Sequence, residues 1–174
     1  MNKVCILVIC MVSLLLLPLK GVAQESQTAY NFLRLPVSAR AAAVGGDGIA
    51  LIEDDASLIF HNPALLSSVS DKQLALNFMT YMAGSTTASA SFNRAVGERA
   101  TWAVSGQFMN YGTMKQTDAS GQQTGDFSAK DIAMAGYFSY MLSDRIAGGV
   151  TAKVVSSFIG DYSSWGVAFD LGVN

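Results

Sequence analysis

The sequence predicts an all-β protein, an antiparallel transmembrane β-barrel of which roughly six strands lie within this chain. Three observations lead to this prediction. From residue 73 to residue 174, apolar and small polar residues alternate in segments of roughly ten residues, the length of a strand that crosses an outer membrane. A secretory signal peptide precedes these segments. No apolar run after Leu17 reaches the length of a transmembrane helix.

Residues 1–23 have the features of a signal peptide. Lys3 places a positive charge at the start, an apolar run extends from Val4 to Leu17, and the small residues Gly21 and Ala23 indicate cleavage after Ala23. A single membrane anchor is the alternative, but a spanning helix needs about 20 apolar residues. Both cysteines lie within this run, so the remaining chain has none for a disulfide or a thiolate metal site.

Residues 24–72 form a second region, which lacks the strand alternation. We expect it to fold inside the barrel as a hatch, or to form a short periplasmic cap. Pro63 keeps Asn62 out of a helical conformation, and an Asn side chain there can bond the backbone two residues on. Gly45, Gly46 and Gly48 permit positive φ or a close backbone approach.

Charged residues in this region suggest a link to the barrel. We expect Arg34 and Arg40 to form a buried polar network with Asp54 and Asp55 that ties the hatch to the barrel interior. The alternative is a solvated periplasmic loop.

Residues 73–174 read as the N-terminal part of a truncated barrel. In each alternating segment one face carries the larger apolar side chains and the other carries small or polar ones, so one face is expected to meet lipid. The expected strands are 73–81, 86–94, 100–111, 130–141, 146–158 and a last one from Ser164. The last strand still alternates at Asn174, so we expect a longer protein. A native end at that residue is the weaker interpretation.

The connections between these segments differ in length. Residues 95–99 and 142–145 are predicted to be tight periplasmic turns, and the polar stretch 112–129 a long extracellular loop. Aromatic residues near strand ends fit an interfacial girdle. These are Tyr81, Trp102, Tyr111, Tyr140, Tyr162 and Trp165.

Charge distribution separates this prediction from a soluble β-sandwich. Charged residues gather in turns, whereas a sandwich carries them on its outward faces. Lys153 and Asp170 are mid-strand exceptions, and both lie on the face assigned to the interior. Without Lys3 and Lys20 the chain has 9 of its 11 basic residues against 13 acidic ones. This mildly acidic, scattered charge does not support nucleic-acid binding.

Several motifs of residues 28–70 carry a family resemblance. The stretch from Phe32 to Gly46, the acidic pair before Ala56, and the stretch from His61 to Leu66 resemble the N-terminal signature of the PorQ family. Members of that family belong to the outer-membrane part of the Bacteroidetes type IX secretion system, and the Asn-Pro-Ala element is similar to the wider PorV and FadL-like groups. The motif residues are Arg34, Pro36, Arg40, Gly45, Gly46, Asp54, Asp55, Asn62, Pro63 and Ala64.

The resemblance implies a FadL-like barrel of about fourteen strands in the full-length protein. It also implies a non-enzymatic protein in the outer membrane of a Gram-negative, Bacteroidetes-type bacterium. The expected partners are outer-membrane lipid, lipopolysaccharide and a PorZ-like surface protein, within the complex that attaches secreted cargo to the cell surface.

The residues themselves predict no catalytic, cofactor-binding or metal site. His61 is the only histidine and stands beside the Asn-Pro pair, which favours a structural role. The run that starts at Gly45 lacks the Lys-Ser/Thr of a phosphate-binding loop. The acidic pair at Asp54 lacks the repeated acidic ladder of a Ca²⁺ loop.

Two alternatives to the secretion role remain. A FadL-like transporter of a hydrophobic ligand needs a continuous apolar lumen, whereas the inward residues expected here are small and polar, as at Ser89, Ser91 and Gln107. This favours the anchoring role. The other alternative is a secreted, soluble β-sandwich binding module.

Overall fold

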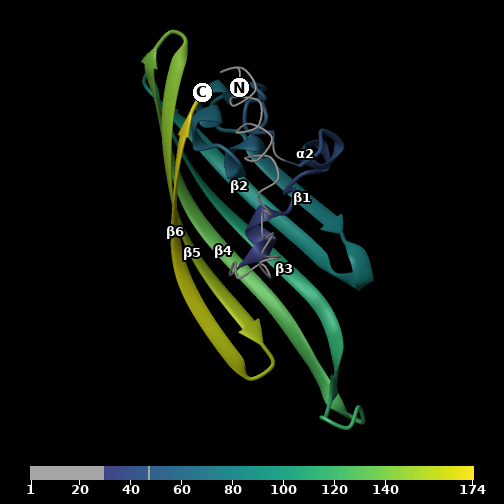
Figure 1. Ribbon diagram of the computed structural model, residues 1–174. Helices are drawn as coiled ribbons and strands as arrows, with labels where there is room; N and C mark the ends of the chain where they lie inside the picture. The colour runs from purple at the N-terminus through teal and green to yellow at the C-terminus, as the bar shows by residue number, and fades with distance from the viewer. Residues whose placement is uncertain (1–29, 47) are drawn as a thin grey trace, which may run out of the picture.

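The computed structural model describes residues 30–46 and 48–174, so the predicted signal peptide lies outside the described residues. These residues form an antiparallel six-stranded sheet in the order β1-β2-β3-β4-β5-β6, in which each strand pairs with its neighbours in sequence. Figure 1 shows a curved, open sheet with the N-terminal segment, residues 30–72, against one face. The all-β, antiparallel prediction is confirmed.

The strands follow the predicted alternation closely. Their bounds are β1 Leu74–Thr80, β2 Thr86–Val96, β3 Ala100–Thr117, β4 Gln123–Ser143, β5 Ile146–Ile159 and β6 Tyr162–Val173. The predicted tight turns are also confirmed, because β2 and β3 are separated by residues 97–99 and β4 and β5 by residues 144–145.

The predicted long loop at 112–129 is wrong. β3 and β4 stay paired past Asn110, across a register shift, and the connection is only residues 118–122. Asp118 closes this turn by accepting hydrogen bonds from the backbone N–H groups of Ser120 and Gln122, both at 2.9 Å. Residues 113–117 of β3 and 123–126 of β4 are exposed on both faces, so their sequence shows no apolar alternation. The remaining connections, 81–85 and 160–161, are short too, so the predicted alternation of loop lengths is absent.

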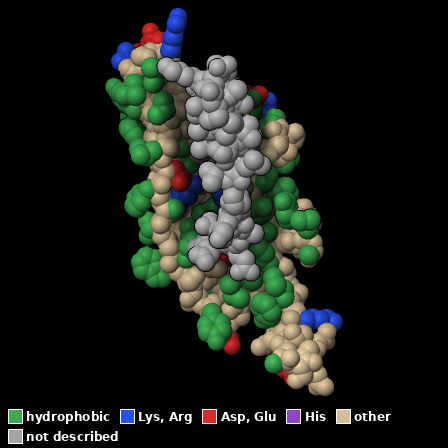
Figure 2. All heavy atoms as spheres, viewed as in Figure 1, with side chains coloured by type: hydrophobic (Ala, Val, Ile, Leu, Met, Phe, Trp, Pro, Cys, Tyr) green, Lys and Arg blue, Asp and Glu red, His purple; other side chains and the backbone are tan. Residues whose placement is uncertain are grey.

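The outer face, defined as the face turned away from the N-terminal segment, is apolar. Leu76, Phe78 and Leu171 are 71%, 73% and 84% exposed, and the alternating members of every strand continue this surface. Figure 2 shows apolar side chains along the margins of the molecule, with many charged ones near its ends. An exposed apolar area of this extent marks a surface that meets lipid or another protein.

The inner face carries small and polar side chains. Thr87, Ser89, Ser91 and Asn93 of β2 are buried on it, as the alternation predicts. Lys153 of β5 also lies on this face, with its side chain 11% exposed, and its Nζ is 2.6 Å from Oδ2 of Asp170 on β6. Charged side chains predicted to face the interior therefore pair with each other there.

Short helical turns make up much of the N-terminal segment. They are η1 Asn31–Arg34, α2 Ala39–Ala43, η2 Leu58–Phe60 and η3 Pro63–Ser68, and a further one, η4 Met82–Gly84, connects β1 to β2. Ser38 caps α2 by accepting the Ala41 N–H at 3.1 Å. Gly45 and Gly46, at φ 99° and 106°, end it by bonding Ala42 O and Ala41 O.

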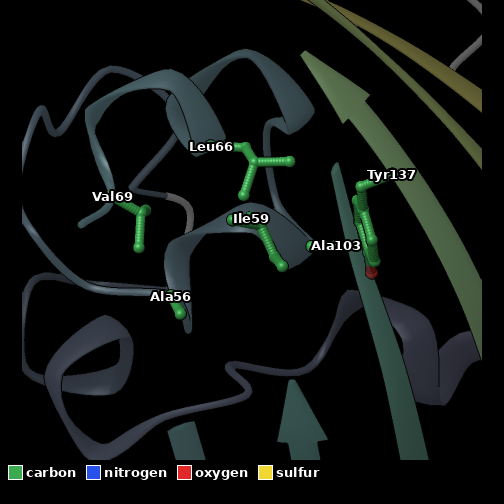
Figure 3. Packing of buried hydrophobic residues seen from close by; sticks show 6 residues of the cluster. All are labelled: Ala56, Ile59, Leu66, Val69, Ala103 and Tyr137. Atoms are coloured by element: carbon green, nitrogen blue, oxygen red, sulfur yellow. The ribbon is translucent and has the colours of Figure 1, made fainter. Parts of the chain in front are cut away.

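Two apolar clusters join the segment to the inner face. Figure 3 shows the first, in which Ile59 and Leu66 lie toward Ala103 of β3 and Tyr137 of β4. The second packs Phe32 against residues of β3, β4 and β5. Across residues 30–46 and 48–174, no helix has both the length and the apolar character needed to cross a bilayer.

Candidate functional site

The Asn62-Pro63-Ala64 motif forms the start of η3. Asn62 is extended, at φ −145° and ψ 111°, and Pro63 is the first residue of the helical turn. Asn62 Oδ1 accepts a hydrogen bond from Ala64 N at 3.0 Å. This is the bond to the backbone two residues on that the sequence predicts, and it is confirmed.

The same motif reaches across to the sheet. Asn62 Nδ2 donates to Ile49 O at 2.7 Å within the segment and to Val173 O of β6 at 3.4 Å. Ser139 of β4 donates from its hydroxyl to Ala64 O at 3.4 Å. All three motif residues are buried, so these bonds lie in an environment where a lost partner is costly.

Two strand glycines create the space into which the motif fits. A Cβ at Gly149 of β5 would overlap the Pro63 carbonyl and Ala64 N, and one at Gly172 of β6 would overlap Asn62 Oδ1. Neither glycine has positive φ. Glycine is required at both positions because the motif approaches the strand backbone closely. Gly149, Gly172 and the motif together are called the docking notch below.

Further hydrogen bonds link the segment to β2. Ser91 donates from its hydroxyl to Ala56 O at 3.1 Å, and Asn93 Nδ2 donates to Ser70 O at 2.8 Å. Gln73, which precedes β1, accepts the Ala56 N–H at 2.9 Å. Polar side chains of the inner face thus satisfy backbone groups of the segment where it has no regular structure.

The acidic pair serves local turns. Asp54 accepts hydrogen bonds from both the Ser70 hydroxyl and the Ser70 N–H at 2.6 Å. These bonds stabilise the charged carboxylate and lower the pKa of Asp54 below its ordinary value. Asp55 accepts the Ser57 N–H at 2.8 Å. Asp54 therefore links its own turn to Ser70, shortly before β1.

The predicted buried network between Arg34, Arg40, Asp54 and Asp55 is wrong. Arg34 and Arg40 are exposed, and Arg40 pairs with Glu53 instead of either aspartate. Both guanidinium side chains are exposed, and long cationic side chains of this kind stay hydrated. Surface pairs of this kind contribute little to stability.

The glycines and Pro36 of the motif have separate roles. Gly45 and Gly46 adopt the positive φ expected of them, and Gly46 lies beside the Pro36 ring. Gly48 has no positive φ, and a Cβ there would make only ordinary contacts with Leu51 and Leu58. The prediction of positive φ or close approach therefore holds at two of these three glycines.

Little space remains between the segment and the middle of the sheet. The cavity lined by Leu33, Phe60, Tyr137 and Lys153 measures about 10 Å³, enough for about one water molecule. A larger pocket of about 470 Å³ opens on the inner face nearer the β3–β4 hairpin. Its lining includes Tyr30, Tyr111, Met114, Phe127 and Asp131.

Within the described ranges there is no group of three or more His, Cys, Asp or Glu side chains placed to hold a metal ion. Comparisons with protein-family models and with curated proteins find no match.

Sequence reasoning missed the sheet side of the docking notch. Gly149, Gly172 and Ser139 lie on neighbouring strands, and the strand register brings them close to the motif. That register cannot be derived from the sequence. The one available signal is that Gly149 and Gly172 interrupt the inner faces of β-strands, where a glycine often marks a close backbone approach.

Proposed function

We propose that this chain is part of a non-enzymatic outer-membrane β-barrel of the type IX secretion system, closed inside by its N-terminal segment as a hatch. It anchors a PorZ-like surface protein in the complex that attaches secreted cargo to lipopolysaccharide. The observation that carries the proposal is a sheet with an apolar outer face and an inner face filled by the chain's own N-terminal segment.

The outer face supports membrane insertion. On β6 the outward apolar residues run from Trp165 to Val173, about 27 Å along the strand at about 3.4 Å per residue. A strand tilt of about 40° reduces this to about 21 Å of height, close to the roughly 25 Å apolar band of such barrels.

The filled interior favours anchoring over transport. A hydrophobic ligand needs a continuous apolar path, whereas the cavity between the segment and the middle strands measures about 10 Å³. The two apolar clusters and the docking notch hold the segment at separate strands. A segment held in place in this way suits a barrel that binds a surface protein and transports no ligand.

One observation favours a second candidate, the FadL-like transporter. The 470 Å³ pocket on the inner face has the size of a small-molecule site, and Met114 and Phe127 give it apolar walls. In this function the hatch would move after a ligand bound in the pocket.

Affinity purification of the tagged full-length protein from native outer membranes tests the two candidates. The secretion role predicts that a large surface protein co-purifies, and that deleting the gene releases cargo from the cell surface while uptake of long-chain fatty acids is unchanged. Loss of fatty-acid uptake with cargo still attached would instead establish the transporter.

Targeted variants sharpen the comparison. Gly172→Ala loosens the hatch, and Gly136→Ala is its control because a Cβ there meets no atom within 4 Å. A fixed closure predicts that Gly172→Ala alone makes the membrane leaky to large antibiotics.

A further inference from the structure

The outer face is grooved. One groove of about 520 Å³ runs over Ala88 and Gly106 between Phe78 and Ile132. A second, of about 570 Å³, continues over Gly136 and Ala152. The two share Ala90, Gly106 and Met134, so they form one continuous depression, called the outer groove below.

The outer groove accepts only an apolar occupant along its length. Its outward side chains are aliphatic, aromatic or, at Met134, a thioether, and β2, β3 and β4 are paired on both sides. The backbone groups beneath it are therefore already hydrogen-bonded. A peptide laid there would leave its own N–H and C=O groups without partners in an apolar surrounding, at a cost of several kcal/mol per group. A flexible hydrocarbon chain has no such groups.

One end of the outer groove is polar and cationic. The register aligns Thr86, Asn110 and Lys130 in one row, directly beyond the row of Ala88, Phe108 and Ile132. Lys130 is exposed and shares the outer face of β4 with Ile132. On this strand the outward side chains change from polar to apolar at that point, so the row lies where a headgroup meets the hydrocarbon.

We propose that the outer groove binds an acyl chain of a phosphate-bearing membrane lipid, with the phosphate beside Lys130. Charge complementarity selects this occupant, since the groove ends at an ammonium group, and Asn110 and Thr86 supply neutral hydrogen-bonding groups next to it. The inference rests on the proposed membrane location of the outer face.

The test measures lipid retention by native mass spectrometry. The full-length protein is reconstituted into nanodiscs of equal parts phosphatidylglycerol and phosphatidylcholine with the same acyl chains, and then released. The wild-type protein is expected to retain phosphatidylglycerol preferentially. Lys130→Ala should reduce that preference about fivefold, the effect of one surface cation on an anionic lipid. Lys115→Ala, on the exposed β3–β4 hairpin, is the matched control and should not change it.

A second variant tests the groove itself. Gly106→Leu places a side chain into open space, because a Cβ there meets nothing within 4 Å. It should abolish retention of both lipids. Ala100→Leu adds similar bulk to the outward face of the same strand outside the groove and should retain lipid normally. Circular dichroism of each variant verifies the strand content.

Three results would overturn the inference: equal retention of the two lipids by the wild type, equal retention by Gly106→Leu and Ala100→Leu, or a second protein copy in place of lipid. Each leaves co-purification of the surface protein unaffected. Failure of the protein to enter membranes at all would instead contradict the proposed function.

Discussion

A methyl group added at Gly172 should release the N-terminal segment from the sheet. The new Cβ would overlap Asn62 Oδ1 and lie 2.9 Å from Pro63 Cδ. Gly149→Ala should act similarly, because its Cβ would lie 2.7 Å from Pro63 O and closer still to the Pro63 carbonyl carbon. The Asn62 side chain is held by three hydrogen bonds, and the backbone and ring atoms of Pro63 cannot move aside as a flexible side chain does, so the motif has to withdraw.

The size of the effect follows from these contacts. Overpacking costs about 1–3 kcal/mol. Withdrawal also weakens the hydrogen bonds from Asn62 to Val173 O and from Ser139 to Ala64 O, which adds about 1 kcal/mol. The total of about 2–4 kcal/mol lowers the free energy of local opening of residues 56–69. At 1.4 kcal/mol per tenfold, backbone hydrogen exchange in this stretch should accelerate roughly 30- to 700-fold.

Hydrogen exchange followed by mass spectrometry of the reconstituted protein measures this change. Gly106→Ala and Gly136→Ala are the controls, because a Cβ at either position meets no atom within 4 Å. Exchange in the β-strands serves as the internal reference. If Gly149→Ala and Gly172→Ala exchanged at the rate of the two controls, the docking notch would not hold the segment.

Three further predictions concern the same interface. Asn62→Ala removes bonds to β6 and within the segment, so the same exchange should accelerate at a cost of about 1–3 kcal/mol, with Asn62→Asp intermediate because it keeps the acceptor. Asp170→Asn leaves the nearly buried Lys153 without its carboxylate and should lower the free energy of unfolding in urea by about 1–2 kcal/mol, discounted because Asp170 is 42% exposed. The double variant Asp170→Asn/Lys153→Met should recover that loss, and an unchanged single variant would contradict the argument. Because the pKa of Asp54 is lowered in the folded protein, the stabilisation from its carboxylate is present above the unfolded pKa of about 4 and disappears as the pH falls through the folded pKa. The Ser70 amide should lose its protection from hydrogen exchange in that pH range. The Asp54→Asn variant should show no such pH-dependent loss.

The strands were predictable because their two faces meet different surroundings. Where β3 lies between an apolar outside and a filled inside, residues 100–110 alternate and their strand is read correctly. From residue 113 of β3 to residue 126 of β4 both faces are exposed, the alternation disappears, and the sequence no longer separates a strand from a loop. The strands stay paired there, but water surrounds both of their faces, so no alternation marks them. This is why residues 112–129 were wrongly predicted to be a loop.

The site was predictable only where it is local. Asn62 and Pro63 determine their own backbone geometry, so the bond to Ala64 follows from three consecutive residues. The partners in β5 and β6 depend on strand register and on how the segment lies across the sheet. Opposite charges alone suggested the incorrect pairing of Arg40, whose actual partner is Glu53.

The docking notch also determines an order of assembly. Asn62 and Val173 are 111 residues apart in sequence, and Ala64 and Ser139 are 75 apart, so the segment depends on strands that are made long after it. Contacts with such separations form slowly, because a long loop must close first. Until β5 and β6 are in place, Pro63 and Ala64 lack the strand glycines against which they lie. In the proposed outer-membrane location, a periplasmic holdase would have to shield this stretch until β5 and β6 pair and receive it.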